Sequence, residues 1–181
     1  MKKSIQSFFL KSSVNNFEKS KNIAKIKPFQ TFSKTKKIGI IFNGFLKENI
    51  DVTRQFIDYF KGKDISCDAL GFVNKKKMND FNLASLNIDY FNLNDCNFFG
   101  FPNTDKVRNF VSEKFDILVN ISEEEHLMYN YIVAHSLAKF KIGKNNNILY
   151  NLLINTKSKL SQDFVSEVIF YLDLISKNNT K

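Results

Sequence analysis

The chain has 181 residues, of which 43% are hydrophobic and 25% are charged, a balance typical of a soluble globular protein. No apolar run approaches the ~20 residues that cross a bilayer as a helix, and residues 1–13 lack the cleavage site of a signal peptide. Cys67 and Cys96 lie far apart and match no metal or disulfide pattern, so we interpret them as reduced thiols and expect a cytoplasmic protein.

The formal net charge of +9 lies entirely in one part of the chain. Residues 1–37 contain ten lysines and one glutamate, whereas the remainder contains 17 basic and 17 acidic residues. This distribution favours a neutral domain with a basic extension. We predict a lysine-rich helical arm and linker over residues 1–35, a single α/β domain over 36–177 and a disordered tail over 178–181.

The apolar residues of the arm fall on two sides of a helical wheel, with Ile5, Phe8 and Phe9 on one and Leu10, Val14 and Phe17 on the other. The amphipathic stripe is therefore imperfect, and three interpretations stay open. The helix packs on the domain with its lysines in solvent, contacts RNA phosphates, or lies on an anionic membrane surface. In the second and third cases the polyanion-binding residues are Lys2, Lys3, Lys11, Lys19, Lys21, Lys25 and Lys27.

The first half of the domain alternates strand and helix signals. A strand is predicted at 37–43 (KIGIIFN), followed by a helix over 52–61 that Asp51 caps and Gly62 ends. A second strand is predicted at 65–73, and the lysines that follow it at 75–77 form a basic turn, read either as a solvated loop or as a phosphate site. Residues 88–91 are compatible with a short strand.

The second half begins with an aromatic loop, CNFFGFPN at 96–103, and a helix capped near Asn103 or Thr104. The apolar run at 115–121 predicts a strand covered on both faces. Ser122 and Glu125 have capping-box spacing for a helix whose apolar stripe continues to residue 138. Lys139 and Lys141 are expected at the end of that helix, where cations are favourable, before a further extended segment.

A last strand at 148–154 and a last helix over 160–176 complete the pattern. Strands that alternate with helices predict right-handed crossovers and a three-layer, mainly parallel open sheet of Rossmann-like type. A ligand in such a sheet binds at the carboxyl ends of the strands. Asparagine is common there, both as a ligand-binding amide and as an ordinary strand-ending turn residue. The predicted ligand rim consists of Asn43, Gly44, Asn74, Asn120, Ser122 and Asn155.

No constellation predicts an activity. The chain has neither a G-x-G-x-x-G nor a G-x-x-x-x-G-K-[ST] motif. His126 and His135 are nine residues apart and cannot share a metal by helix spacing, whereas His135 and Ser136 point about 100° apart on a helix. We therefore predict no catalytic residue, metal or cofactor, and favour a non-catalytic protein.

Several segments in order resemble a family of small bacterial proteins known only as a domain of unknown function: the basic N-terminal helix, KKIGIIFN, CNFFGFPNTDKVRNF, KFDILVNIS, YIVAHSLAKFKIG, LLIN and VIFYLDLIS. The resemblance implies no activity, ligand or catalytic residue. The segments 115–119 and 138–143 are also similar to one half of heptosyltransferase-type glycosyltransferases, a likeness of fold alone.

The expected function is that of an interaction protein whose basic arm engages an anionic partner, with RNA or a ribonucleoprotein preferred. Two other classes stay open. One is a small-molecule-binding protein or enzyme that uses the carboxyl rim of the sheet, and the other is a peripheral membrane or envelope-associated protein. A protein partner is compatible with all three.

Overall fold

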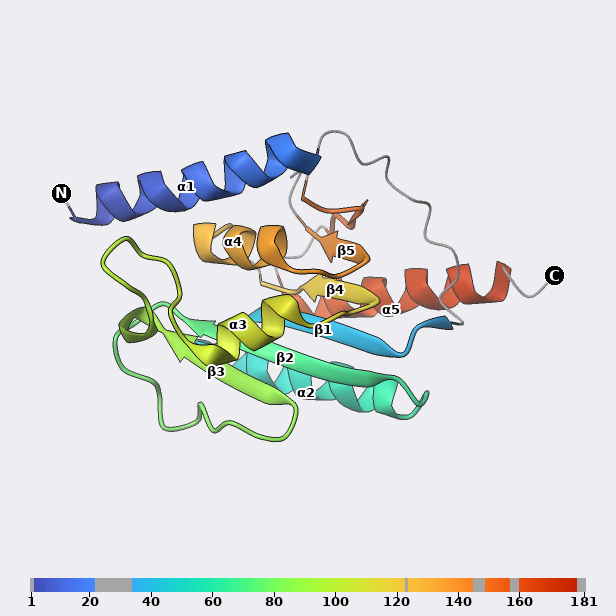
Figure 1. Cartoon of the computed structure of the whole chain (residues 1–181). Coiled ribbons are helices and arrows are strands. Elements are labelled where there is room, and N and C mark those ends of the chain that lie inside the picture. The colour runs from blue at the N-terminus through green and yellow to red at the C-terminus, as the bar shows by residue number, and fades with distance from the viewer. Residues whose placement is uncertain (1, 22–33, 123, 145–148, 157–159, 179–181) are drawn as a thin grey trace.

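The computed structural model describes residues 2–21, 34–122, 124–144, 149–156 and 160–178. Its centre is one six-stranded sheet in which all paired strands are parallel, in the order β3-β2-β1-β4-β5-β6 (Figure 1). The strands are β1 (Lys37–Asn43), β2 (Ser66–Val73), β3 (Ile88–Asn92), β4 (Ile117–Asn120), β5 (Phe140–Gly143) and β6 (Leu152–Leu153). The strand order reverses between β1 and β4, as in doubly wound folds.

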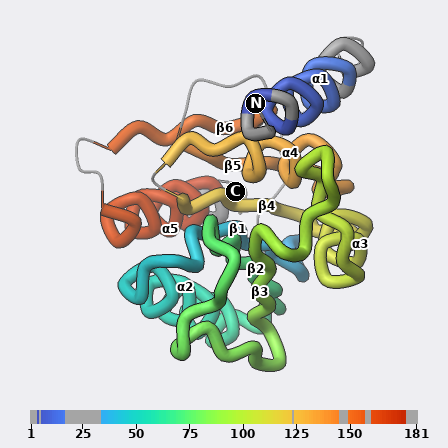
Figure 2. The backbone as a smooth tube through the Cα atoms, turned by 90° about the vertical axis from the view of Figure 1, so that its left-hand side faces the viewer, coloured from blue at the N-terminus to red at the C-terminus, as the bar shows by residue number. Residues whose placement is uncertain are grey.

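Helices cover both faces of the sheet, which confirms the predicted three-layer α/β fold. Figure 2 shows the strands stacked from β3 to β6, with helices on both sides of the stack. The first layer is α2 (Lys47–Lys61) and α5 (Ser161–Asn178), and the second is α1 (Lys2–Lys21), α3 (Asp105–Ser112) and α4 (Leu127–His135). A short 3-10 helix, η2 (Leu93–Asp95), follows β3.

The strand β1 shows why a central strand of this sheet is apolar on both of its faces. Its apolar residues point in turn to the two layers: Ile40 and Phe42 pack with α2 and α5, whereas Ile41 packs with α4. Because both faces are covered, the strand is a nearly continuous apolar run. Gly39 interrupts it where a Cβ atom would lie 2.7 Å from the Phe115 ring, so a side chain there would displace the aromatic packing.

The start of α2 in the first half differs from the prediction. The helix α2 begins at Lys47, not at residue 52, and Asp51 lies inside it, 3.4 Å from Arg54. The turn between β1 and α2 is held by the Asn43 side chain, which accepts a hydrogen bond from the Phe45 N–H (2.9 Å). The predicted stop is confirmed, since the helix ends at Lys61 and the Gly62 N–H bonds to the Asp58 carbonyl.

The second half contains larger corrections. The helix α4 begins at Leu127 with His126 as its N-cap, so the Ser122–Glu125 capping box is wrong. This helix ends at His135. Lys141, which was predicted at the end of the helix, lies in β5 instead. Of the strand predicted at 148–154, residue 148 lies outside the described residues, and among 149–154 only Leu152–Leu153 form a strand. The two errors at the ends of α4 have the same cause, because local signals were outweighed by contacts with distant segments, as described below.

Candidate functional site

Two asparagines of the predicted rim, Asn43 and Asn120, hold turns of the fold. Asn120 at the end of β4 is buried, and its Nδ2 donates to the Tyr150 hydroxyl (2.7 Å). Its Oδ1 accepts from both the backbone N–H (3.1 Å) and the hydroxyl (2.6 Å) of Ser122. Ser122 therefore serves this turn instead of capping α4. The side chains of Asn43, Asn120 and Ser122 therefore have structural roles, because their hydrogen bonds stabilise turns.

The other rim residues are placed differently. The Gly44 carbonyl accepts a hydrogen bond from Asn82 Nδ2 (2.7 Å), so the loop after β2 lies over the end of β1. Asn74 and Asn155 are exposed. Sequence reasoning missed Asn92, which ends β3, caps η2 and donates to the Lys76 carbonyl (3.0 Å). The strands β1, β3 and β4 each end in asparagine, and all three of these side chains fix loops.

One polar group near the strand-order reversal has no partner among the residues that the structure describes. Asn49 lies in the first turn of α2, its side chain is buried, and its Nδ2 makes no hydrogen bond to any described residue. A buried amide without a partner is costly and calls for an explanation. It is the only buried amide nitrogen of this kind in the described part of the chain.

The two histidines have structural roles in the described residues. His126 caps α4, because its Nδ1 accepts a hydrogen bond from the Met128 N–H (3.1 Å). His135 Nδ1 donates to the Tyr131 carbonyl (2.8 Å), and its ring stacks on that of Tyr131 with centroids 4.1 Å apart. This confirms that His135 is a hydrogen-bonded helix residue near the core.

The cap makes the stability of α4 depend on pH. Burial lowers the pKa of His126 below its ordinary value of 6.5, so the unfolded chain takes up this proton more readily than the folded one. The free energy of unfolding is therefore highest above pH 6.5 and falls as the pH drops through the lowered pKa. We expect His126→Asn, which caps without titrating, to remove this part of the loss in urea unfolding between pH 7.5 and 5. An unchanged pH dependence would contradict the role of His126.

The helix α1 is docked on the domain by one of its two apolar sides. Leu10 and Val14 are buried, and Val14 belongs to the same cluster as the residues of α4 that face the sheet. Gln6 Nε2 donates to the Phe98 carbonyl (3.0 Å), and the Ser13 hydroxyl lies 3.3 Å from His135 Nε2. These contacts join α1 to α4 and to the loop that follows η2.

The other apolar side of α1 is open to solvent. Phe8 is 68% exposed and Phe98, on the neighbouring loop, is 62% exposed. Together with the partly exposed Phe9 and Phe99 they form a continuous set of edge-to-face rings, which we call the aromatic cluster (Phe8, Phe9, Phe98 and Phe99). The sequence shows the phenylalanines of the arm and those of the aromatic loop, but it does not predict that the two groups are in contact.

Positive charge lies on the same helix. Lys11 is exposed and follows Phe8 by three residues, which places the two on adjacent turns of one face. The helix contains five lysines and one glutamate. The predicted polyanion-binding residues within it are Lys2, Lys3, Lys11, Lys19 and Lys21. Lys25 and Lys27 lie outside the described residues.

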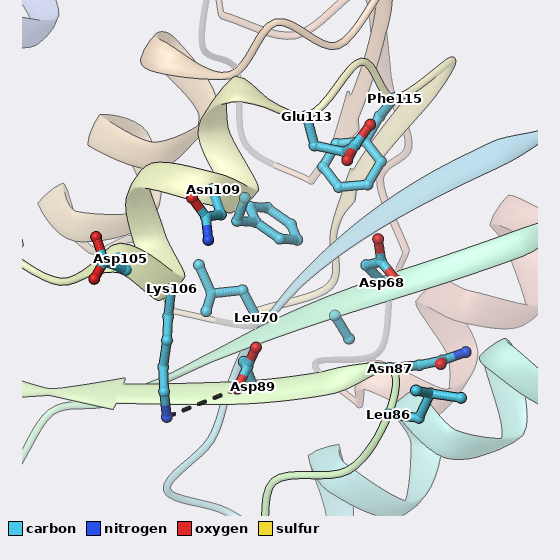
Figure 3. A pocket seen from close by; sticks show the side chains of 12 residues that line it. Asp68, Leu70, Leu86, Asn87, Asp89, Asp105, Lys106, Asn109, Glu113 and Phe115 are labelled. Atoms are coloured by element: carbon cyan, nitrogen blue, oxygen red, sulfur yellow. Dashed lines mark ion pairs between the residues drawn. The ribbon is translucent and has the colours of Figure 1, made fainter.

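A groove of about 320 Å³ lies between α3 and the first halves of β2 and β3 (Figure 3). Its charged lining residues are four carboxylates and one lysine: Asp68, Asp89, Asp105, Glu113 and Lys106. Lys106 Nζ lies 3.7 Å from Asp89, and Lys37 bridges Asp68 and Glu113 at 2.9 and 3.1 Å. The negative excess makes this groove unsuitable for an anionic partner.

Within the described ranges, no three His, Cys, Asp or Glu side chains are grouped to hold a metal ion. The helices that the structure describes include none long and apolar enough to cross a membrane. Burial raises the pKa of the Cys67 thiol to about 12 and that of Cys96 to about 11. Neither thiol is therefore an activated nucleophile.

These features define a doubly wound α/β protein with an N-terminal helix packed on one of its helical layers. The chain belongs to a family of unknown function (DUF6913), whose model matches residues 6–175. This confirms the resemblance found in the sequence, and the matched range includes most of α1 as well as the sheet. No curated protein and no solved structure matches the chain. The likeness to heptosyltransferase-type enzymes stays a prediction.

Proposed function

We propose that this protein is a non-catalytic, cytoplasmic RNA-binding protein, and that α1 is the element that contacts RNA or a ribonucleoprotein. The observation that carries the proposal is the orientation of α1. Its buried side holds Leu10 and Val14, so its outer side presents Lys11, polar residues and the exposed Phe8. Lysines on a fixed helix can contact phosphates without the entropy cost of ordering a flexible arm.

The same orientation favours RNA over a membrane as the polyanion. A helix that lies on a membrane needs a continuous apolar face to bury among the lipids. In α1 the side with Leu10 and Val14 is already packed on the domain. The remaining outer side combines Lys11, Asn15 and Asn16 with two phenylalanines, a mixture of cationic, polar and aromatic groups that suits nucleic acid.

Fractionation of a cell lysate tests the proposal. The tagged chain is compared with a triple lysine variant (Lys2→Gln, Lys3→Gln and Lys11→Gln). Point substitutions are preferable to removal of residues 1–36, because Val14 contributes to the core. We expect the unchanged chain to travel with RNA-containing particles and to become free after RNase treatment. The triple lysine variant should be largely free even without RNase. An unchanged chain that is free before RNase, or that stays with membranes after it, would contradict the proposal.

A small-molecule site at the carboxyl rim is the second candidate, and the unpartnered amide of Asn49 is the observation that favours it. This amide lies in the first turn of α2, directly after β1, where doubly wound folds bind ligands. A ligand bound there would raise the midpoint of thermal unfolding, and Asn49→Leu would abolish that rise.

A further inference from the structure

We infer that the aromatic cluster is a stacking surface for unpaired bases, so that the RNA bound by α1 is single-stranded. This inference rests on the proposed function and names the form of nucleic acid that the same surface takes. It starts from the burial pattern. Large apolar side chains normally lie inside, yet Phe8 and Phe98 are mostly exposed, on two segments about 90 residues apart in the sequence.

The four rings form one continuous surface. The centroids of Phe8 and Phe9 are 5.8 Å apart, those of Phe9 and Phe99 are 4.9 Å apart, and those of Phe98 and Phe99 are 5.6 Å apart. The three interplanar angles lie between 69° and 87°. Phe9 and Phe99 are the inner pair that joins α1 to the loop, and the more exposed Phe8 and Phe98 lie at the two ends. Bases can therefore stack at both ends of the cluster.

The loop that presents Phe98 and Phe99 is held in one conformation. Asn97 Oδ1 accepts hydrogen bonds from the backbone N–H groups of Phe99 (3.0 Å) and Phe101 (3.1 Å). Gly100 has a φ of 87°, which other residues rarely adopt, and a Cβ atom there would lie 3.0 Å from Gln6. The close approach of α1 thus depends on this glycine. Rings fixed before binding lose little freedom when a base stacks on them.

The chemistry of the surface indicates which polyanion fits. The lysines of α1 can contact phosphates of any nucleic acid, but the aromatic cluster adds a contact only where base faces are free. In a duplex the bases stack on one another and their faces are hidden. The lysines therefore provide general affinity, and the phenylalanines provide the preference for single strands.

Binding of the purified full-length chain to labelled RNA tests the inference. The probes are a 20-nucleotide single strand and a duplex of the same length, measured by fluorescence anisotropy at one salt concentration. Stacking contributes a factor of roughly 5 to 150 per base. We expect the single strand to bind at least about tenfold more tightly than the duplex, and Phe8→Ala with Phe98→Ala to remove most of that difference while duplex binding is unchanged.

Two controls keep the result interpretable. Phe170→Ala removes a 58% exposed phenylalanine from α5, in the opposite layer, and is expected to leave both affinities unchanged. Phe8→Tyr with Phe98→Tyr keeps the aromatic faces and is expected to retain the preference. Equal binding of strand and duplex, with no effect of the alanine variant, would overturn the inference and leave the proposed function standing. Failure to bind either RNA at low salt would overturn both.

Discussion

Replacing Lys141 by Met is expected to lower the free energy of unfolding by about 3 kcal/mol. Lys141 is only 2% exposed, and its Nζ donates hydrogen bonds to the carbonyls of Val133 and Ser136 (2.9 Å for the latter). These carbonyls lie at the end of α4, where the helix dipole favours a cation. Methionine fills a similar volume but cannot donate, so two carbonyls that this ammonium serves would lose its hydrogen bonds.

Urea unfolding measures this loss, with Lys139→Met as the matched control. Lys139 Nζ lies 2.7 Å from Asp116, but its side chain is 73% exposed, so the control should cost at most about 1 kcal/mol. The free energy of unfolding of small proteins falls by about 1–3 kcal/mol per molar urea. The urea midpoint of the Lys141 variant should therefore be at least about 1 M below that of the unchanged chain. Equal midpoints for the two variants would show that the buried ammonium does not stabilise the end of α4.

The triple lysine variant is expected to lose both affinity for single-stranded RNA and the salt dependence of that affinity. Each phosphate contact adds about 0.7 to the slope of log affinity against log salt for a single strand. Three lost contacts therefore reduce the slope by about 2. Between 50 and 200 mM salt the unchanged chain should then lose roughly 20-fold more affinity than the variant does.

A control of equal net charge separates this effect from the overall charge of the protein. Lys47, Lys61 and Lys114 are exposed and lie outside α1, so their replacement by Gln removes the same three charges from other surfaces. This control should bind RNA almost as the unchanged chain does. If both triple variants weaken binding equally, α1 is not the contacting element.

The layered fold could be predicted because its signals are local and repeated. Buried parallel strands such as β1 and β4 are short apolar runs, and α2 and α5 have clear apolar stripes. The alternation of these elements is enough to indicate a parallel sheet with helices on both faces. The strand order was not predicted, because pairing is decided by contacts between distant segments.

The region around α4 shows how distant contacts override local signals. Ser122 has the spacing of a capping residue, but the turn it belongs to is held by Asn120, whose amide bonds to Tyr150. Lys141 resembles a cation of a final helical turn. Its Nζ does bond to a carbonyl at the end of α4, but the residue itself lies in β5. The predicted cap at Ser122 is therefore wrong, whereas for Lys141 the sequence indicated a cation at the end of this helix but not the strand that supplies it.

The candidate site divides in the same way. The lysines and phenylalanines of residues 1–17 and the aromatic loop at 96–103 are visible in the sequence as separate features. Only the docking of α1 through Leu10 and Val14, and the hydrogen bond from Gln6 to the Phe98 carbonyl, bring them together. The rim asparagines are conspicuous in the sequence, yet Asn43 and Asn120 hold loops, as does Asn92, which the sequence did not single out.

The affinity of the full-length chain for a single-stranded RNA, measured at 50 and at 200 mM salt, shows whether α1 engages RNA through its lysines. If the seven predicted lysines all contact phosphates, the affinity should fall by roughly a thousandfold over this range, and proportionately less with fewer contacts. An affinity that is the same at both salt concentrations, or no binding at 50 mM, would contradict a role for α1 in engaging RNA.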